Sequence, residues 1–403
     1  MPTATEADRS VANPPAQIVR PYEDVWAENE KRHAWKIAIA EWHNPPVKEA
    51  KLPYAWQDYD NRHAAAFREK YRLQELIAGS ADDWEAVLRL RHWAFTHVRD
   101  GNPSFPAEAP EDIVSSSLAG ATYYCTYFAY AFVAAANAVG FSARHLGIDC
   151  EHERGEASSH HGVADVWVNS LRKWVAVDPN YDYHYELNGV PLNAEEIGNL
   201  WRSRKGDGMS VFIGPERREV PRGRQSRVDK HESCGYYWCY IDSENDTFHR
   251  RRQNWPNPVV FLVDEERKRR KWYQGDKENS QEHGRYTNGS FITTERYADA
   301  YPDLNCVNLT LLPPTKIPYG CRVQFGNGCT PNFSHVLLRE DGGAPFRVDG
   351  LEYPWRLHPG ANSLEARLVN HAGLQGPPSR VVVRVDEDRS RQPEWPDSWK
   401  RAD

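Results

Sequence analysis

The sequence has few cysteines, no long apolar run and no excess of positive charge. Its seven cysteines in 403 residues are too sparse for a disulfide framework, and their odd number leaves at least one thiol unpaired within a single chain. No window approaches the roughly 18 uncharged apolar residues of a membrane span. Fifty basic against 57 acidic residues give a net charge of −7, which argues against a general nucleic-acid binder. We therefore expect neither a membrane nor a nucleic acid as partner; the oligomeric state stays open.

The amino-terminal residues are polar, acidic and proline-containing, unlike the basic and then apolar residues of a signal peptide. This predicts a cytoplasmic location for the chain as written, and a secreted one if a leader has been removed. Cys234 with Cys239, and Cys321 with Cys329, could form short disulfides in an oxidising compartment. In a reducing cytoplasm, which the N-terminus favours, they would be small packing residues.

The composition is that of a globular protein, with 40% hydrophobic, 27% charged and 12% aromatic residues. The length exceeds one ordinary domain, so we expect several units. The predicted units are a tail and helical extension (1–78), a mixed α/β core (79–214), an irregular, basic and aromatic-rich segment (215–304), a β-sandwich (305–388) and a second tail (389–403).

Apolar periodicity supports the first two units. Apolar residues recur at helical spacing in 24–40 and 62–76, so both stretches are predicted to be helices. Asp82 and Asp83 begin a predicted helix over about 82–98, and an apolar run from Thr126 ends at Gly140, which is typical of a buried helix with a glycine cap. Residues 163–168 and 174–177 are rich in Val and Trp and predict two strands.

The last two large units differ in pattern. Short alternating runs between 307 and 385 are separated by Pro, Gly and Asn turns at intervals of about ten residues, which predicts an antiparallel β-sandwich of the immunoglobulin or fibronectin type. The segment before it carries arginine clusters, which we interpret mainly as ion-paired solvated residues. Some of its aromatic residues could line a cleft that binds sugars or peptides.

Three residues between 120 and 180 form a candidate catalytic set. Cys125 precedes the buried helix, where unpaired N–H groups and the helix dipole can stabilise a thiolate and then an oxyanion. His161 begins a predicted strand and Asp178 ends the next, so a hairpin could bring them together as base and orienting carboxylate. Taken alone, Cys125 would be interpreted as a buried packing residue; the ordered trio favours catalysis.

A second cluster near this set could be a metal site. Asp149, Cys150, Glu151 and His152, with His160 and His161, hold enough donor atoms for zinc, but their spacing fits no zinc signature. We interpret the cluster as a His-rich loop and predict no metal and no cofactor.

The flanks of the three residues resemble those of the bacterial transglutaminase-like domain. The matching segments are 124–126 (YCT), 140–144 (GFSAR), 161–168 (HGVADVWV) and 174–179 (WVAVDP). The resemblance implies an α+β protein with a papain-like core, in which Cys125 is the nucleophile, His161 the general base and Asp178 the orienting acid. Tyr123 stands where such domains often have glycine, which predicts a narrower cleft.

The resemblance also implies a function. We expect a cysteine hydrolase or acyltransferase of the protease or amidase type, which attacks an amide-like bond through a thioester. The alternatives are a carbohydrate-directed enzyme of the same superfamily and a non-catalytic binding scaffold, so a peptide, an amide or a glycan is the expected partner. Trp93, Tyr124 and His160 are further candidates for the oxyanion site or the cleft.

Overall fold

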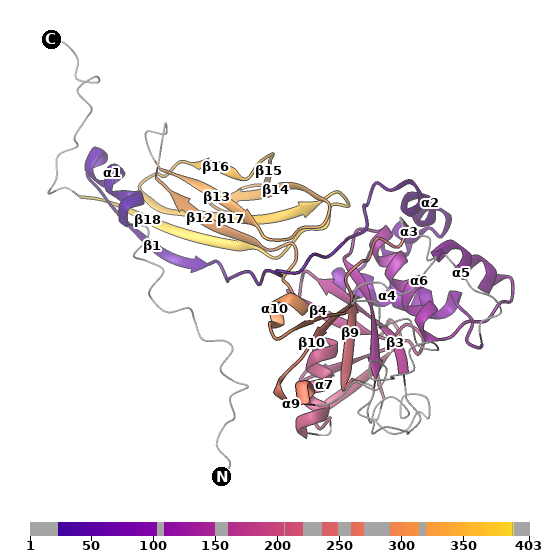
Figure 1. The fold of residues 1–403 in the computed structure, drawn as a ribbon. Helices are drawn as coiled ribbons and strands as arrows, with labels where there is room; N and C mark the ends of the chain where they lie inside the picture. Colours follow the sequence, from indigo (N-terminus) through magenta and orange to yellow (C-terminus); the bar gives the residue numbers. More distant parts are fainter. Residues whose placement is uncertain are drawn as a thin grey trace.

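The computed structural model describes residues 23–102, 109–149, 160–204, 206–220, 236–248, 259–269, 291–313, 320–388 and 390. They form a mixed α/β body and an elongated sandwich beside it (Figure 1). The protein is thus of the α+β class, as the sequence predicts. None of the helices in these ranges is both long and apolar enough to span a membrane.

A layer of helices covers one face of the central sheet and surrounds the apolar helix α6 (Figure 1). The predicted helix near 82–98 is confirmed, and the Asp82 carboxylate caps it by accepting a hydrogen bond from the Glu85 N–H. The predicted apolar helix is confirmed as well, and Gly140 follows it at a φ of +95°. The layer consists of α2 (Arg62–Lys70), α3 (Leu73–Ile77), α4 (Asp83–His97), α5 (Pro110–Leu118) and α6 (Cys125–Ala138).

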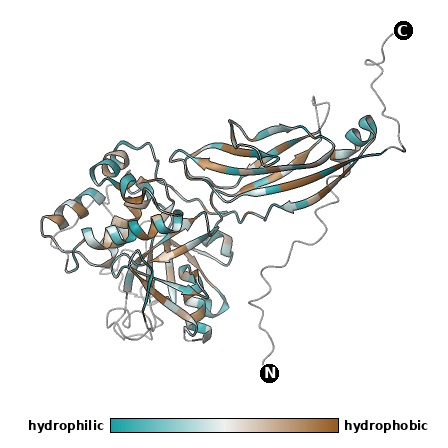
Figure 2. Ribbon diagram, turned by 180° about the vertical axis from the view of Figure 1, so that it is seen from behind, coloured by the Kyte–Doolittle hydropathy of each residue, from teal (hydrophilic) through white to brown (hydrophobic). Residues whose placement is uncertain are grey.

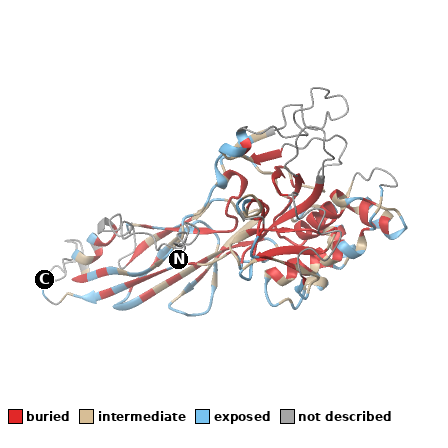
Figure 3. Ribbon diagram, turned by 90° about the horizontal axis from the view of Figure 1, so that it is seen from below, coloured by how far each residue is buried: buried red, intermediate tan, exposed pale blue. Residues whose placement is uncertain are grey.

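The central sheet has the strand order β11-β10-β9-β2-β3-β4. Its strands are β2 (Ala143–Asp149), β3 (His160–Val168), β4 (Lys173–Val177), β9 (Trp238–Asp242), β10 (Val259–Leu262) and β11 (Phe291–Thr294). Alternate residues of β3 serve two cores: Ala164 and Val166 face the helices, whereas Val163 and Trp167 pack on the other side. Strands β2, β3, β4 and β9 are buried along almost their whole described length (Figure 3).

A second, smaller sheet packs on the far side of the central one, in the order β6-β5-β7-β8. Its strands are β5 (Tyr183–Leu187), β6 (Val190–Pro191), β7 (Met209–Ile213) and β8 (Arg218–Val220). Short helices accompany this side: α7 (Ala194–Arg204), α9 (Glu265–Arg269) and α10 (Tyr297–Ala300). The tight connection from β4 to β5 holds Asp178, the predicted orienting acid.

The sandwich consists of two antiparallel sheets that share one apolar core. One sheet contains β12 (Val307–Leu312), β13 (Cys321–Asn327) and β16 (Glu352–Trp355). The other contains β1 (Trp35–His43), β14 (Phe333–Glu340), β15 (Phe346–Val348), β17 (Gly360–Asn370) and β18 (Ser379–Glu387). Hydrophobic and hydrophilic residues alternate along the strands (Figure 2), which confirms the predicted pattern. Its assignment to the immunoglobulin or fibronectin type stays a prediction.

Two secondary-structure predictions were wrong. The stretch 24–40 is not one helix: α1 (Glu23–His33) ends before Ala34, which has a φ of +51°, and β1 follows and pairs antiparallel with β18. The alternation of WKIAIAEWH fits a strand with a distant partner, which a local helical pattern does not reveal. The segment 215–304 is not irregular where it is described, because β9 lies inside the central sheet beside β2. The unit boundaries themselves remain predictions.

Among the described cysteines, none forms a disulfide. Cys321 begins β13 and Cys329 lies beyond its end, and an extended strand of that length separates its ends by roughly 20 Å. This is far beyond the reach of a disulfide. Cys239 is a buried thiol, and its predicted partner Cys234 lies outside the described residues.

Candidate active site

Cys125 is the first residue of α6 and is partly exposed. Its sulfur accepts a hydrogen bond from the Gly162 N–H at 3.3 Å, across from the adjacent strand β3. The residue before it, Tyr124, provides no side-chain cap to the helix. The first N–H groups of a helix have no partner within it, so this end of α6 presents donors and positive potential next to the sulfur.

His161 and Asp178 lie at the same end of β3 and β4. The His161 Nε2 and Asp178 Oδ2 atoms are 2.6 Å apart, and both side chains are buried. Burial lowers the pKa of His161, but the Asp178 carboxylate and the Cys125 sulfur outweigh it and raise this pKa to about 10. Because Nε2 bonds to Asp178, the interaction with Cys125 falls to Nδ1. The structure thus brings the three predicted residues together.

The connection after β4 fixes the Asp178 carboxylate in place. Its Oδ1 atom accepts hydrogen bonds from the N–H groups of Asn180 and Tyr181, at 2.9 and 3.1 Å. The Tyr181 ring stacks on the His161 imidazole, with ring centroids 5.2 Å apart and planes 16° apart. The Asp178 carboxylate, which bonds to Nε2, and the Tyr181 ring, which stacks on one face, therefore hold the His161 imidazole in a single orientation.

Glycine at position 162 allows β3 to approach the helix end. A Cβ atom there would lie 2.8 Å from both the Cα and the Oγ1 of Thr126, closer than real Cβ contacts. Any larger residue would push β3 away from the start of α6. The small residue that follows His161 is therefore part of the geometry that brings the imidazole to the sulfur.

The other predicted site residues have different roles. Trp93 is a core residue of α4: it is 5% exposed and stacks on His97, so its expected role at an oxyanion site has no support in its contacts. Tyr124 is 41% exposed beside Cys125, as a cleft residue would be. His160 belongs to β3, but its side chain lies outside the described part, and His161 is the histidine on Asp178.

The prediction that Tyr123 narrows the cleft has no support in the contacts of its side chain. Its side chain is fully buried, and its hydroxyl hydrogen-bonds to Ser116 of α5 at 2.8 Å. The backbone of Tyr123 also bonds to Arg99 and Gly101, which fixes the segment that leads into Cys125. The Tyr123 ring therefore packs within the helical layer.

Sequence reasoning missed a buried polar network behind Asp178. Arg91 occupies a position that the apolar periodicity of α4 assigns to the core, and it is fully buried with Asp182 and His184 as partners. A charged residue at an apolar position of a helix was the available signal. Tyr181, two residues after the Asp-Pro step, was missed as well.

The absence of a metal site stays a prediction. The described residues contain no group of three or more His, Cys, Asp or Glu side chains that could hold a metal ion. Residues 150–152 of the His-rich cluster lie outside the described ranges.

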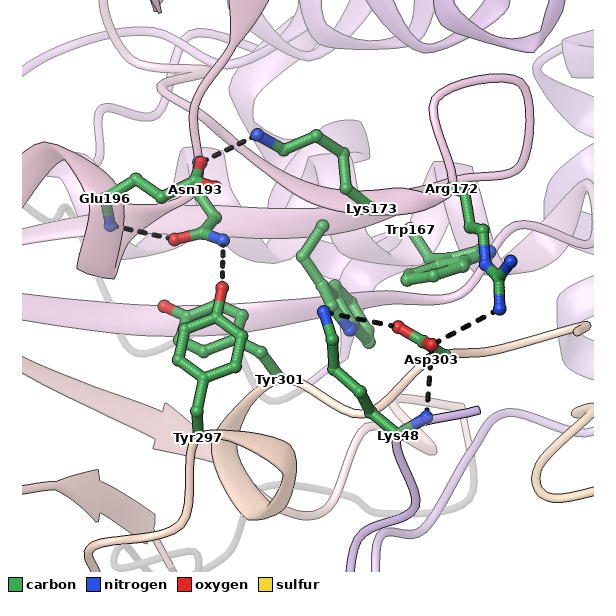
Figure 4. A pocket seen from close by; sticks show the side chains of 10 residues that line it. Lys48, Trp167, Arg172, Lys173, Asn193, Glu196, Tyr297, Tyr301 and Asp303 are labelled. Atoms are coloured by element: carbon green, nitrogen blue, oxygen red, sulfur yellow. Dashed lines mark hydrogen bonds and ion pairs between the residues drawn. The ribbon is translucent and has the colours of Figure 1, made fainter. Parts of the chain in front are cut away.

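A pocket of about 120 Å³ lies at the opposite end of β3 and β4 from the candidate active site (Figure 4). The pocket residue Trp167 lies six positions along β3 from His161, which corresponds to roughly 20 Å. Asp303 faces Lys48 and Arg172 there at 3.8 and 3.7 Å. Lys173 pairs with Glu196 at 2.7 Å, and the hydroxyl of Tyr297 accepts from Asn193 at 2.8 Å. The pocket is lined by paired charges and shares no residue with the site around Cys125.

Comparison with known proteins locates a family match on the same segment as this site. Residues 70–179 match the model of the transglutaminase-like superfamily, and no curated protein matches the chain. A solved structure from Cytophaga hutchinsonii, named as a candidate cysteine protease, is 14% identical with a TM-score of 0.25; the comparison covers 45% of this chain. The chain spans 58% of that structure's length. The segment that carries Cys125, His161 and Asp178 thus matches the transglutaminase-like superfamily.

Proposed function

We propose that the protein is a cysteine-dependent hydrolase or acyltransferase that acts on an amide-like bond through a Cys125–His161–Asp178 triad. This proposal rests on one observation: the Asp178 carboxylate bonds to His161, and His161 in turn interacts with the Cys125 sulfur at the start of α6. The raised pKa of His161 favours an imidazolium, and the two partners stabilise each other's charge when the sulfur is a thiolate. The transglutaminase-like match supports the same chemistry.

In the first half of the reaction, the Cys125 thiolate attacks the carbonyl carbon and a carbon–sulfur bond forms. The carbonyl oxygen becomes an oxyanion beside the N-terminal N–H groups of α6, which can donate to it. The tetrahedral species then collapses, and the carbon–nitrogen bond breaks as the His161 imidazolium gives its proton to the leaving amine. The product of this half is a thioester on Cys125.

In the second half, neutral His161 takes a proton from the acceptor, which then attacks the thioester carbonyl. The carbon–sulfur bond breaks, the thiolate leaves, and the imidazolium–thiolate pair is restored. Asp178 keeps the ring in the required tautomer throughout, because its carboxylate accepts from Nε2–H. Water is the acceptor in hydrolysis and an amine in transfer; we propose water, and a peptide or another amide as substrate.

Limiting alkylation with iodoacetamide tests the nucleophile directly. Cys239, Cys306, Cys321 and Cys329 serve as internal comparators, because burial raises the pKa of each of these thiols, to about 12 for Cys306. Cys150 and Cys234 are changed to serine so that only Cys125 and these four thiols compete for the label. Peptide mapping after brief labelling near neutral pH should find the label predominantly on Cys125.

A histidine pair provides the matched control. His161→Ala removes the proposed base, and His160→Ala removes the adjacent imidazole of the same strand. We expect H161A to slow Cys125 alkylation by about 100-fold or more, and H160A to leave it nearly unchanged. Equal labelling of all thiols in the parent protein, or equal effects of the two substitutions, would refute the proposed triad.

A further inference from the structure

The loop that carries Asp178 also carries most of the contacts around His161. It closes tightly: the N–H groups of Asp178 and Tyr183 each donate to the other residue's carbonyl, at 2.9 and 3.2 Å. Within it, Asp178 bonds to the imidazole and Tyr181 stacks on it. The position of the imidazole therefore depends on how this loop is attached to the rest of the domain.

The attachment point is Asp182, the last residue before β5. Its backbone has a φ of +56°, a left-handed conformation that is uncommon for a residue other than glycine. Its buried carboxylate accepts from the Arg91 Nε at 2.8 Å through Oδ1 and lies 2.7 Å from the His92 Nδ1 through Oδ2. Arg91 also donates to the Gly214 carbonyl, and the Gly214 N–H donates to the Asp182 carbonyl. The Arg91 guanidinium thus holds the Asp182 side chain directly and the Asp182 backbone through Gly214.

Arg91 is itself held by further partners. Its Nη1 atom lies 2.7 Å from the Nδ1 of His184, and the Nε2 of that ring lies 2.8 Å from Glu186. Burial lowers the pKa of His184 to about 4, so the ring is neutral near pH 7. Since a guanidinium cannot accept, Nδ1 accepts from Arg91 and Nε2–H donates to Glu186. Arg217 completes the network with bonds of 2.6 and 2.7 Å to the Glu186 carboxylate.

The network connects the two halves of the site. Arg91 belongs to α4, which packs against α6, the helix that begins with Cys125. Asp182 belongs to the loop that carries Asp178 and Tyr181. Arg91 is also near enough to Asp178 for the two charges to attract each other. A single buried side chain therefore links the helical layer that holds the nucleophile to the loop that orients the base.

We propose that Arg91 is a positioning residue of the site: through Asp182 it holds the 178–183 loop where Asp178 and Tyr181 can orient His161 toward Cys125. This inference rests on the proposed function. A misplacement of about 1 Å can slow a reaction by about 100-fold, so the loss of this link should lower the reactivity of the sulfur even though Arg91 touches none of the reacting atoms.

The test compares Arg91→Gln, Asp182→Asn and the double variant with Arg89→Gln. Arg89 lies on the same helix but bonds to Glu85, outside the network. The first readout is the rate of Cys125 alkylation in the folded protein, well below the melting temperature. The second is the NMR resonance of the His161 Nε2–H proton, which reports the bond to Asp178 and is assigned by its loss in Asp178→Asn.

We expect R91Q and D182N each to lower the alkylation rate by about 10- to 100-fold and to shift or broaden the imidazole proton. The double variant should be no slower than the slower single one, because the two residues act as a unit. R89Q should stay within about twofold of the parent. Arg91→Lys, which keeps the charge without the fork, should recover part of the rate.

Folded R91Q and D182N proteins with the parent's rate and imidazole resonance would overturn the proposal. A merely structural role would lower the melting temperature and leave both readouts unchanged in the folded state. If R91Q does not fold, D182N decides the question, because asparagine keeps the shape of the aspartate. Failure of the proposed function itself looks different: the parent protein would then show no preference for Cys125, whatever the state of residue 91.

Discussion

Gly162→Ala is the sharpest perturbation that the site offers, because it adds one methyl group and removes no polar contact. The new Cβ would lie 2.8 Å from the Thr126 Cα, whereas ordinary contact begins at 3.4 Å. The strand must therefore move from the helix by about 0.6 Å. The Gly162 nitrogen lies 3.3 Å from the Cys125 sulfur in the parent protein. Because His161 is the neighbour of Gly162 in the chain, both the Gly162–Cys125 and the His161–Cys125 contacts should lengthen.

We expect two effects of different size. Overpacking at such a contact costs about 1–3 kcal/mol in the free energy of unfolding. Because near-attack geometry is sensitive to shifts of this size, the alkylation rate of Cys125 should fall by about 10-fold or more. Urea denaturation measures the first effect, and iodoacetamide kinetics on the folded variant measures the second.

Gly326→Ala provides the matched control. Gly326 is also a strand glycine, and its added Cβ would lie 3.2 Å from the Asn308 Cβ, but it belongs to β13 of the sandwich. G326A should lose some stability and keep the parent's rate of Cys125 alkylation. A folded G162A protein that alkylates as fast as the parent would refute the argument that close approach of β3 to α6 creates the reactive geometry.

Three further predictions concern the charges and the topology. Because the His161 pKa is raised from 6.5 to about 10, its bond to Asp178 stabilises the folded state fully below pH 6.5 and loses this effect as the pH rises through about 10. Melting curves should therefore show that Asp178→Asn lowers the melting temperature much more at pH 7 than above pH 10. Arg144→Met should reduce the free energy of unfolding by about 3–5 kcal/mol, since it leaves the buried Asp165 carboxylate without its cation, and urea denaturation of R144M and of R144M/D165N should show partial recovery in the double variant. Ile37→Ala should cost about 2–5 kcal/mol in the same measurement without slowing Cys125 alkylation, because Ile37 is buried in the sandwich core.

The convergence of Cys125, His161 and Asp178 could be predicted from sequence because each residue has a local signal. A cysteine begins an apolar helix, a histidine begins a strand, and an Asp-Pro step ends the next strand; hairpin geometry then brings the last two together. The choice of His161 over His160 depends on the resemblance, in which the histidine lies four residues before the strand acid Asp165, and the bond to Asp178 is made by His161. Local patterns suffice here because the elements that carry the set follow one another in the chain.

The missed features depend on partners that are distant in sequence. Strand β1 pairs with β18, more than 300 residues away, so the sequence around 35–43 does not contain the partner that stabilises it as a strand. Arg91 has the same difficulty: its bond to Asp182 spans 91 residues, and without that partner a charge at an apolar position has no evident use. Trp93, a predicted candidate for the oxyanion site, lies in the core of the helical layer.

The helix that carries Cys125 is held at both ends by other parts of the fold. At its start, β3 approaches through Gly162 and donates a hydrogen bond to the sulfur. Beyond its end, the Asn370 side chain of the sandwich donates to the Gly140 carbonyl at 2.8 Å, and Ala372 lies so close that a Cβ on Gly140 would be 2.2 Å from its own Cβ. The two glycines have equivalent roles, because each lets a neighbouring element contact the end of α6 directly. A shift of the sandwich would therefore move α6 along with it, and this gives the sandwich a physical link to the candidate active site.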